Sequence, residues 1–129
     1  MIEPRWLALV HILAIHSDQI QAHGGSLGLR DRGLLESALD RPRNRFHYEP
    51  DSDLPALAAA YGFGLANNHP FVDGNKRVAF QSMYLFLGLN GFRIEAPEEE
   101  VVAVVLSLAS EDVDESGLAE WLRQHITPR

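Results

Sequence analysis

Apolar residues recur along this chain at intervals of three and four positions, which is the spacing of helices that bury one face. The pattern predicts an all-α fold, a compact bundle of about six helices. The first five are expected over approximately residues 4–23, 33–41, 54–67, 75–90 and 98–109. The last is expected to carry Leu118, Trp121 and Leu122 toward the core.

Prolines, glycines and capping residues set the expected boundaries. Pro4 suits the first turn of the first helix, whereas Pro42 is expected to end the second. Asp31 and Asp53 each precede a helix and can cap it, and Gly91 follows the fourth helix where a left-handed C-cap is favourable.

The C-terminal third combines opposing signals. A short extended piece is expected over residues 92–95, and Pro97 with the acidic run at 98–100 favours a helix start, because carboxylates stabilise the positive end of a helix dipole. The valine-rich stretch that follows has a high strand propensity, but we predict that it continues this helix. Asp114 or Ser116 can cap the last helix.

The third and fourth helices, LPALAAAYGFGLA and VAFQSMYLFLGL, are apolar on nearly every face, so we expect them to form the buried centre. The segment between them, residues 67–77, is polar. Pro70 disfavours helical geometry at His69, and Gly74 allows a backbone conformation that other residues avoid. We therefore expect a loop that presents free backbone N–H groups at the start of a buried helix.

Composition narrows the class of protein. The length of 129 residues predicts one domain over residues 1–129, and the absence of cysteine excludes disulfides and thiolate chemistry. No apolar stretch approaches the ~18 residues of a membrane span, and the N-terminal sequence lacks signal-peptide features, so we expect a cytoplasmic protein without membrane contact. Residues 1–94 carry no net charge, and the net charge of −7 arises in residues 95–129, which would repel nucleic acid. We expect no direct binding of nucleic acid.

The charges of the central loop indicate an anion site. Lys76, the only lysine of the chain, and Arg77 stand in the first turn of a helix, where cations oppose the dipole unless an anion binds there. Asp73 is a natural ligand for magnesium, which bridges carboxylates and phosphates, and His69 can serve as a base. These residues suggest nucleotide-phosphate binding with a histidine that deprotonates an acceptor hydroxyl.

Singly, each of these residue types is common in turns that have no function. Their concentration within nine residues, between two buried helices, favours a site. The other five histidines have no such neighbours in the sequence, and we interpret them as structural, without the ligand spacing of a metal centre. These are His11, His16, His23, His47 and His125.

The segment HPFVDGNKR, residues 69–77, resembles the HPFx(D/E)GN(G/K)R signature of the Fic/Doc (Fido) superfamily. The stretches IHSDQIQAHGGSLGLRDRGLLESALDRP, residues 15–42, and LFLGLNGF are similar to the death-on-curing (Doc) toxins of type II toxin–antitoxin systems. The similarity covers essentially the whole chain. It implies a bundle of about six helices with the motif loop between two central ones.

The resemblance also implies residue roles. His69 corresponds to the general base, Asp73 to the Mg²⁺ ligand, and Phe71 to an aromatic that anchors the loop in the core. The residues implied to bind the nucleotide phosphates are Gly74, Asn75, Lys76 and Arg77.

Two positions separate the subclasses of the superfamily. AMP-transferring members have a second glycine where this chain has Lys76 and a further arginine where it has Phe80. The death-on-curing branch has the lysine and lacks that arginine, which implies transfer of the γ-phosphate of ATP to a threonine of elongation factor Tu, with a block of translation. Gly74 belongs equally to the AMP-transferring pattern, so AMP transfer to a protein hydroxyl is the alternative.

Two other function classes fit less well. A non-catalytic binding module has no need of a base beside an anion site, and a ribonuclease toxin would gain little from a neutral body and an acidic C-terminal segment. The expected partner is an antitoxin resembling the prevents-host-death (Phd) family, because residues 107–112 match only part of the (S/T)xxxE(G/N) inhibitory motif of some Fic proteins. Arginines within residues 30–45 are its expected second contact.

Overall fold

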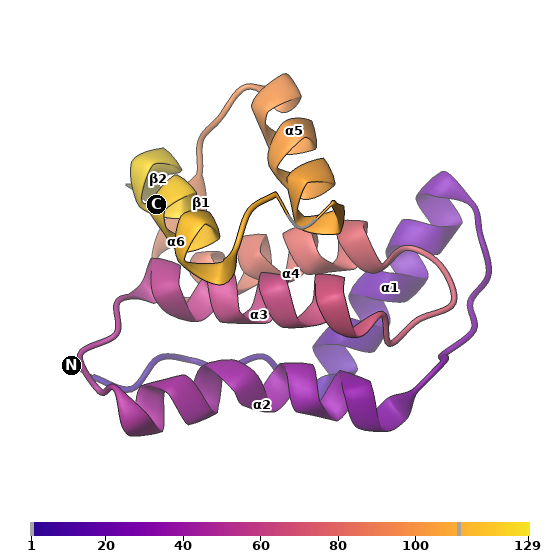
Figure 1. The fold of residues 1–129 in the computed structure, drawn as a ribbon, viewed down its shortest axis with the longest axis horizontal. Helices are drawn as coiled ribbons and strands as arrows, with labels where there is room; N and C mark the ends of the chain where they lie inside the picture. Colours follow the sequence, from indigo (N-terminus) through magenta and orange to yellow (C-terminus); the bar gives the residue numbers. More distant parts are fainter. Residues whose placement is uncertain (1, 111) are drawn as a thin grey trace.

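Six helices account for most of the part of the chain that the computed structural model describes, residues 2–110 and 112–129 (Figure 1). They are α1 (Leu9–His23), α2 (Arg32–Tyr48), α3 (Leu54–Asn68), α4 (Asn75–Leu89), α5 (Glu98–Ala109) and α6 (Glu115–His125). Two short strands, β1 (Phe92–Ile94) and β2 (Ile126–Pro128), pair antiparallel. The expected helical bundle is confirmed. Glu111 of the partial inhibitory motif lies outside the described residues.

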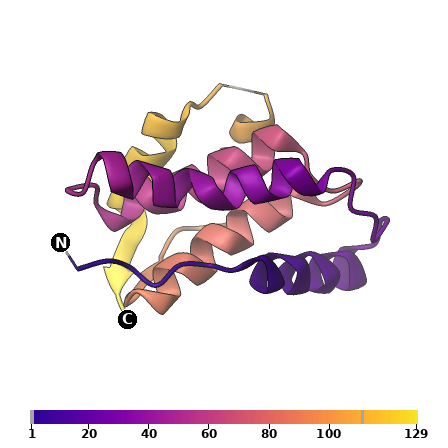
Figure 2. The same ribbon diagram turned by 90° about the horizontal axis from the view of Figure 1, so that it is seen from below.

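The helices α3 and α4 form the centre of the bundle, with α2 against one side of α3 and α5 and α6 on the other side of the pair (Figure 1). Almost every residue of α3 from Pro55 to Ala66 is buried, as its apolar sequence predicts. A Cβ at Gly62 would overlap the side chain of Met83, so any larger residue there would force Met83 to move where α3 and α4 approach closely. This central pair carries the motif loop at one end, and the two chain termini lie near the opposite end (Figure 2).

The first helix begins later than predicted. Residues 2–8 are not helical, and α1 starts only at Leu9, after Ala8. In this non-helical segment the Leu7 N–H donates to the buried Tyr61 hydroxyl at 3.0 Å. The Trp6 ring lies 5.9 Å from that of Phe86. The prediction was wrong because these contacts with α3 and α4 outweigh the local signal of Pro4.

The second helix continues through Pro42, which was predicted to end it, and stops only at Tyr48. A proline inside a helix removes one backbone hydrogen bond, but long-range contacts support the turns that follow. The Phe46 ring packs edge-on against Trp6, and Arg45 forms an ion pair with Glu115 of α6 at 2.8 Å. The predicted end failed because tertiary contacts hold the last turns.

The predicted caps and the C-terminal helices agree with the structure. Asp31, Asp53 and Asp114 each accept a backbone N–H in the first turn of a helix, at 3.0, 3.0 and 2.7 Å. Gly91 has a φ of 94°, and the valine-rich segment is helical, as predicted. The strand β2 was not predicted. It forms because the chain after α6 returns beside β1.

Several arginines within residues 30–45, which were predicted to contact an antitoxin, interact with other parts of the bundle. Arg41 and Arg45 both bind the Glu115 carboxylate, at 2.6 and 2.8 Å, and Arg43 lies over the Trp6 ring. These side chains therefore hold the bundle together.

No helix within residues 2–110 or 112–129 combines the length and apolar character needed to cross a bilayer.

Candidate functional site

The loop between α3 and α4 is bounded by two residues in left-handed conformation. His69 ends α3 with φ 49° and ψ 55°, and Gly74 precedes α4 with φ 83°. Glycine adopts this conformation without strain, whereas for a histidine it is uncommon. The loop thus reverses the chain within a few residues and leaves the His69 side chain exposed.

The loop is anchored from inside the bundle. Phe71 is 2% exposed, and its backbone N–H and carbonyl both bond to the Asn75 side chain, at 3.0 and 2.9 Å. The ring of His16 on α1 stacks on Phe71 with centroids 3.8 Å apart, and its Nε2 lies 2.9 Å from the Asp73 carbonyl oxygen. Because a carbonyl only accepts, Nε2 carries the proton in this bond. The core position expected for Phe71 is confirmed.

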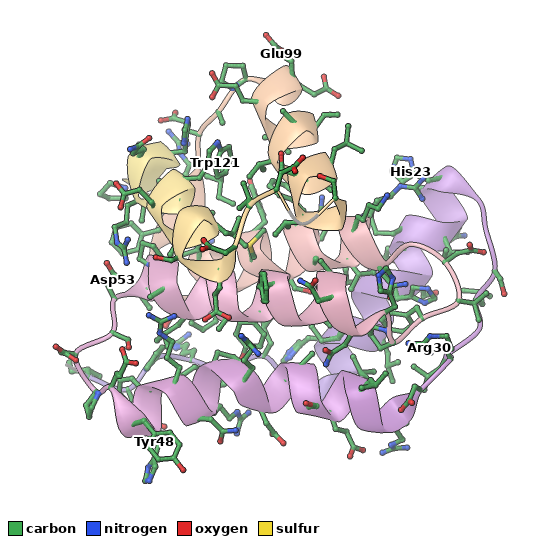
Figure 3. All side chains as sticks on the ribbon, in the orientation of Figure 1. His23, Arg30, Tyr48, Asp53, Glu99 and Trp121 are labelled. Atoms are coloured by element: carbon green, nitrogen blue, oxygen red, sulfur yellow. The ribbon has the colours of Figure 1, made fainter. Side chains whose placement is uncertain are left out.

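The segment that joins α1 to α2 pairs with the loop on its outer side. The Val72 N–H donates to the Gly28 carbonyl at 2.9 Å, and the N–H groups of Arg30 and Asp31 both donate to the Pro70 carbonyl, at 2.7 and 3.0 Å. Figure 3 shows Arg30 at this end of the molecule. Sequence analysis missed these contacts, since they join segments about 40 residues apart.

A cleft of about 830 Å³ lies beside the loop. Its other walls come from the end of α1, the first turns of α4 and one face of α5. This volume is in the range of sites that bind small molecules. All six residues that the sequence singled out line the cleft, namely His69, Asp73, Gly74, Asn75, Lys76 and Arg77.

One end of the cleft is suited to an anion. The first N–H groups of a helix have no acceptor within it, and those of Asn75, Lys76 and Arg77 have no partner among the described residues. The side chains of Lys76 and Arg77 are exposed, and neither forms an ion pair within the described ranges. Free N–H groups, the helix dipole and two cations therefore meet there. The Asn75 side chain binds the Phe71 backbone through Oδ1 and one Nδ2 hydrogen, which fixes its position in the loop, and its backbone N–H stands at the start of α4.

Asp73 is the carboxylate of this end of the cleft. Its Oδ2 accepts the Ser26 N–H at 2.7 Å, which orients the side chain and leaves Oδ1 without a partner among the described residues. In residues 2–110 and 112–129, no group of three or more His, Cys, Asp or Glu could hold a metal ion. A magnesium ion fits because it takes one or two carboxylates and completes its shell with substrate phosphates and water.

The opposite wall of the cleft is mostly apolar. It includes Phe80 on α4 and, on α5, the acidic Glu98 together with Val101, Val102, Val105 and Leu106. Phe80, at the position where the resemblance implies an arginine in AMP-transferring members, adds apolar surface to the cleft. His23, interpreted from the sequence as structural, also lines the cleft at the end of α1 (Figure 3).

Comparisons with known proteins agree with this geometry. The model of the Fic/DOC family matches residues 6–87, which include the complete loop. The protein kinase Doc of Escherichia phage P1 is 32% identical over 121 residues, 93% of this chain and 94% of that protein. Toxin Doc of Mycolicibacterium smegmatis is 45% identical over 78 residues, 58% of each chain. The chain therefore belongs to the Fic/Doc family, as a Doc-type member with a full-length relative that is named a protein kinase.

Proposed function

We propose that this Doc-type kinase transfers the γ-phosphate of ATP to a threonine hydroxyl of elongation factor Tu and thereby blocks translation. The observation that carries the proposal is the meeting of His69, Asp73 and the cationic start of α4 in one cleft. The full-length similarity to a protein kinase supports phosphoryl transfer as the reaction.

The residues of the cleft divide the chemistry between them. The N–H groups at the start of α4 and the side chains of Lys76 and Arg77 bind the phosphates and stabilise their negative charge. Asp73 would hold Mg²⁺, which would supply positive charge to the phosphate oxygens.

His69 accepts the proton of the acceptor hydroxyl. The hydroxyl oxygen then forms a bond to the γ-phosphorus, and the bond from this phosphorus to the β,γ-bridging oxygen breaks. ADP leaves with the electron pair of that bond.

AMP transfer is the second candidate, because Gly74 with its φ of 83° is shared with the AMP-transferring pattern. Two residues favour phosphoryl transfer over it. Lys76 replaces a small residue by a cation at the start of α4, and Phe80 places a ring where that pattern has an arginine. Both changes alter where a triphosphate finds positive charge, and hence which phosphorus faces the acceptor.

The proposed biological setting is a type II toxin–antitoxin module. Both relatives carry the Doc name, and one is called a toxin. We expect restraint by an antitoxin of the prevents-host-death type, whose C-terminal segment folds on binding and brings a carboxylate toward Arg77. The activity is placed in the cytoplasm, where ATP and elongation factor Tu are found together.

The test incubates the purified protein with Mg-ATP and purified elongation factor Tu and measures the intact mass of the factor. Addition of one phosphate supports the proposal, addition of one adenylate establishes AMP transfer, and an unchanged mass contradicts this target. ATP labelled at the γ or the α position, added to cell extract, then shows whether another protein is modified. Degraded RNA in that extract would establish the ribonuclease alternative.

A further inference from the structure

Three successive carbonyl groups at the end of α3 are held by one distant residue. The Arg30 guanidinium donates through Nε to the His69 carbonyl at 2.6 Å and through Nη2 to the Asn68 carbonyl at 2.8 Å. The backbone N–H of Arg30 donates to the Pro70 carbonyl at 2.7 Å. The main chain on both sides of the His69 side chain is therefore tied to the segment before α2.

These bonds replace the usual ending of a helix. The last carbonyl groups of a helix find no N–H donor within the helix. A backbone N–H at the C-cap often donates to one of them. The described residues provide no such cap bond for α3, which ends at the left-handed His69. The fork of Arg30 satisfies two of these carbonyls and brings a cation to the negative end of the helix dipole.

We propose that Arg30 is a positioning residue for His69, whose conformation it fixes so that the imidazole faces the cleft. The inference rests on the proposed role of His69 as the base. A general base acts only within hydrogen-bond reach of the proton it removes, so a small shift of its main chain lowers the rate of transfer. Arg30 does not line the cleft, and its effect is exerted through His69.

Lysine cannot replace this arginine, because an ammonium group lacks the planar fork that reaches two carbonyls at once. The chain also provides a matched control. Arg32, two residues later, is exposed and binds Glu36 of its own helix at 2.8 Å. Its removal deletes the same charge near the same place without touching the loop.

The test measures kcat and KM for Mg-ATP in Arg30→Ala, Arg30→Gln, Arg30→Lys and Arg32→Ala, with thermal denaturation of each variant. We expect Arg30→Ala to lower kcat by about 10- to 100-fold. KM should change by less than about twofold, because the substitution does not alter the groups at the start of α4 that are proposed to bind the phosphates. Arg30→Lys should not restore the rate, and Arg32→Ala should behave as wild type. Added guanidinium ion should recover part of kcat in Arg30→Ala and none in His69→Ala.

Two results would overturn the proposal. One is a wild-type kcat in folded Arg30→Ala or Arg30→Gln. The other is a loss of kcat that follows the loss of thermal stability and does not respond to guanidinium, since that would make Arg30 merely structural.

A second readout separates this inference from the proposed function. The ¹³Cα and ¹³Cβ chemical shifts of His69 report its left-handed backbone, and Arg30→Ala should move them whereas Arg32→Ala should not. If the wild type transfers nothing from ATP, the proposed reaction is wrong. That result leaves the role of Arg30 to be decided by the chemical shifts of His69. Unmoved shifts in a folded Arg30→Ala variant would refute it.

Discussion

His69 is the only non-glycine residue with a positive φ in the described part of the chain. A left-handed conformation costs such a residue about 1–2 kcal/mol. It persists where the surroundings fix it, here the Arg30 guanidinium on one side and the buried Phe71 on the other. This strain falls on the proposed base, which agrees with a functional constraint on the loop.

The first prediction concerns the base itself. His69→Ala should lower transfer by about 10²- to 10⁴-fold, because proton removal from the acceptor is lost. Calorimetric binding of Mg-ATP should persist, since the groups proposed to bind the phosphates lie at the start of α4. His47→Ala, an exposed change on α2, is the matched control and should retain wild-type transfer. Wild-type transfer by His69→Ala would contradict the assignment.

A second prediction concerns Tyr61, whose fully buried hydroxyl accepts the Leu7 N–H. Tyr61→Phe should destabilise the protein by about 1–3 kcal/mol in urea denaturation, because the change leaves a buried N–H unpaired. Burial raises the pKa of Tyr61 above its usual value. The phenol ionises more readily in the unfolded chain, so wild-type stability should fall as pH rises above about 10. A Tyr61→Phe variant as stable as wild type would show that water satisfies Leu7.

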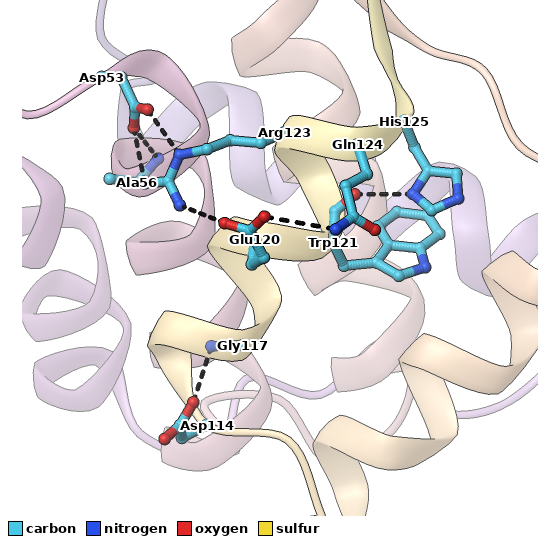
Figure 4. A network of polar contacts seen from close by, with 9 residues as sticks. All are labelled: Asp53, Ala56, Asp114, Gly117, Glu120, Trp121, Arg123, Gln124 and His125. Carbon is cyan, nitrogen blue, oxygen red and sulfur yellow. Dashed lines mark hydrogen bonds and ion pairs between the residues drawn. The ribbon is translucent and has the colours of Figure 1, made fainter.

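At the scale of the elements, α6 is fastened to the start of α3. Asp53 caps α3 through the Ala56 N–H and binds Arg123 of α6 at 2.6 and 3.1 Å (Figure 4). The hydrogen bond from Arg123 lowers the pKa of Asp53. Protonation therefore favours the unfolded chain, and this contribution should be lost as pH falls below about 4.

Substitutions separate the cap from the ion pair. Asp53→Ala removes both and should cost about 1–2 kcal/mol, whereas Asp53→Asn keeps a good cap and should cost a few tenths, since the pair is substantially exposed. Arg123→Gln leaves the cap intact and should match Asp53→Asn in chemical denaturation. Equal destabilisation by Asp53→Ala and Asp53→Asn would show that the cap contributes nothing.

The elements also show how far sequence alone predicts this structure. Helices that carry their own local signals were predicted, including the three aspartate caps and the turn at Gly91. The late start of α1, the passage of α2 through Pro42 and the strand β2 were not, because each depends on contacts with distant segments. The same holds at the site: the motif loop was identified, but its supports at His16 and Arg30 come from other parts of the chain.

At the scale of the whole molecule, the fold gives the loop a rigid base and an open side. The buried pair α3 and α4 fixes both ends of the loop, and the segment before α2 fixes its outer edge. The remaining wall comes from α5, whose residues Val102 and Leu106 are about half exposed. At the start of α4, Lys76 and Arg77 have no ion-pair partner among the described residues.

The last prediction follows from this unneutralised charge. Lys76→Ala and Arg77→Ala should each stabilise the free protein by about 0.3–1 kcal/mol, because a cation at a helix N-terminus opposes the dipole. With Mg-ATP the sign reverses. A ligand present at 100 times its Kd stabilises the fold by about 2.7 kcal/mol, and weaker binding by either variant should remove much of that gain.

Thermal denaturation with and without Mg-ATP measures both effects on one sample. Arg93→Ala is the matched control, since it removes an exposed arginine paired with Glu95, outside the residues that line the cleft, and should leave the Mg-ATP shift at its wild-type size. If Arg77→Ala retains the full shift, the phosphates do not bind at the start of α4. If it retains none and also lowers the melting temperature of the free protein, Arg77 supports the fold instead of opposing the helix dipole. Only a higher melting temperature without the nucleotide, combined with a smaller shift with it, shows that α4 carries these cations for the ligand.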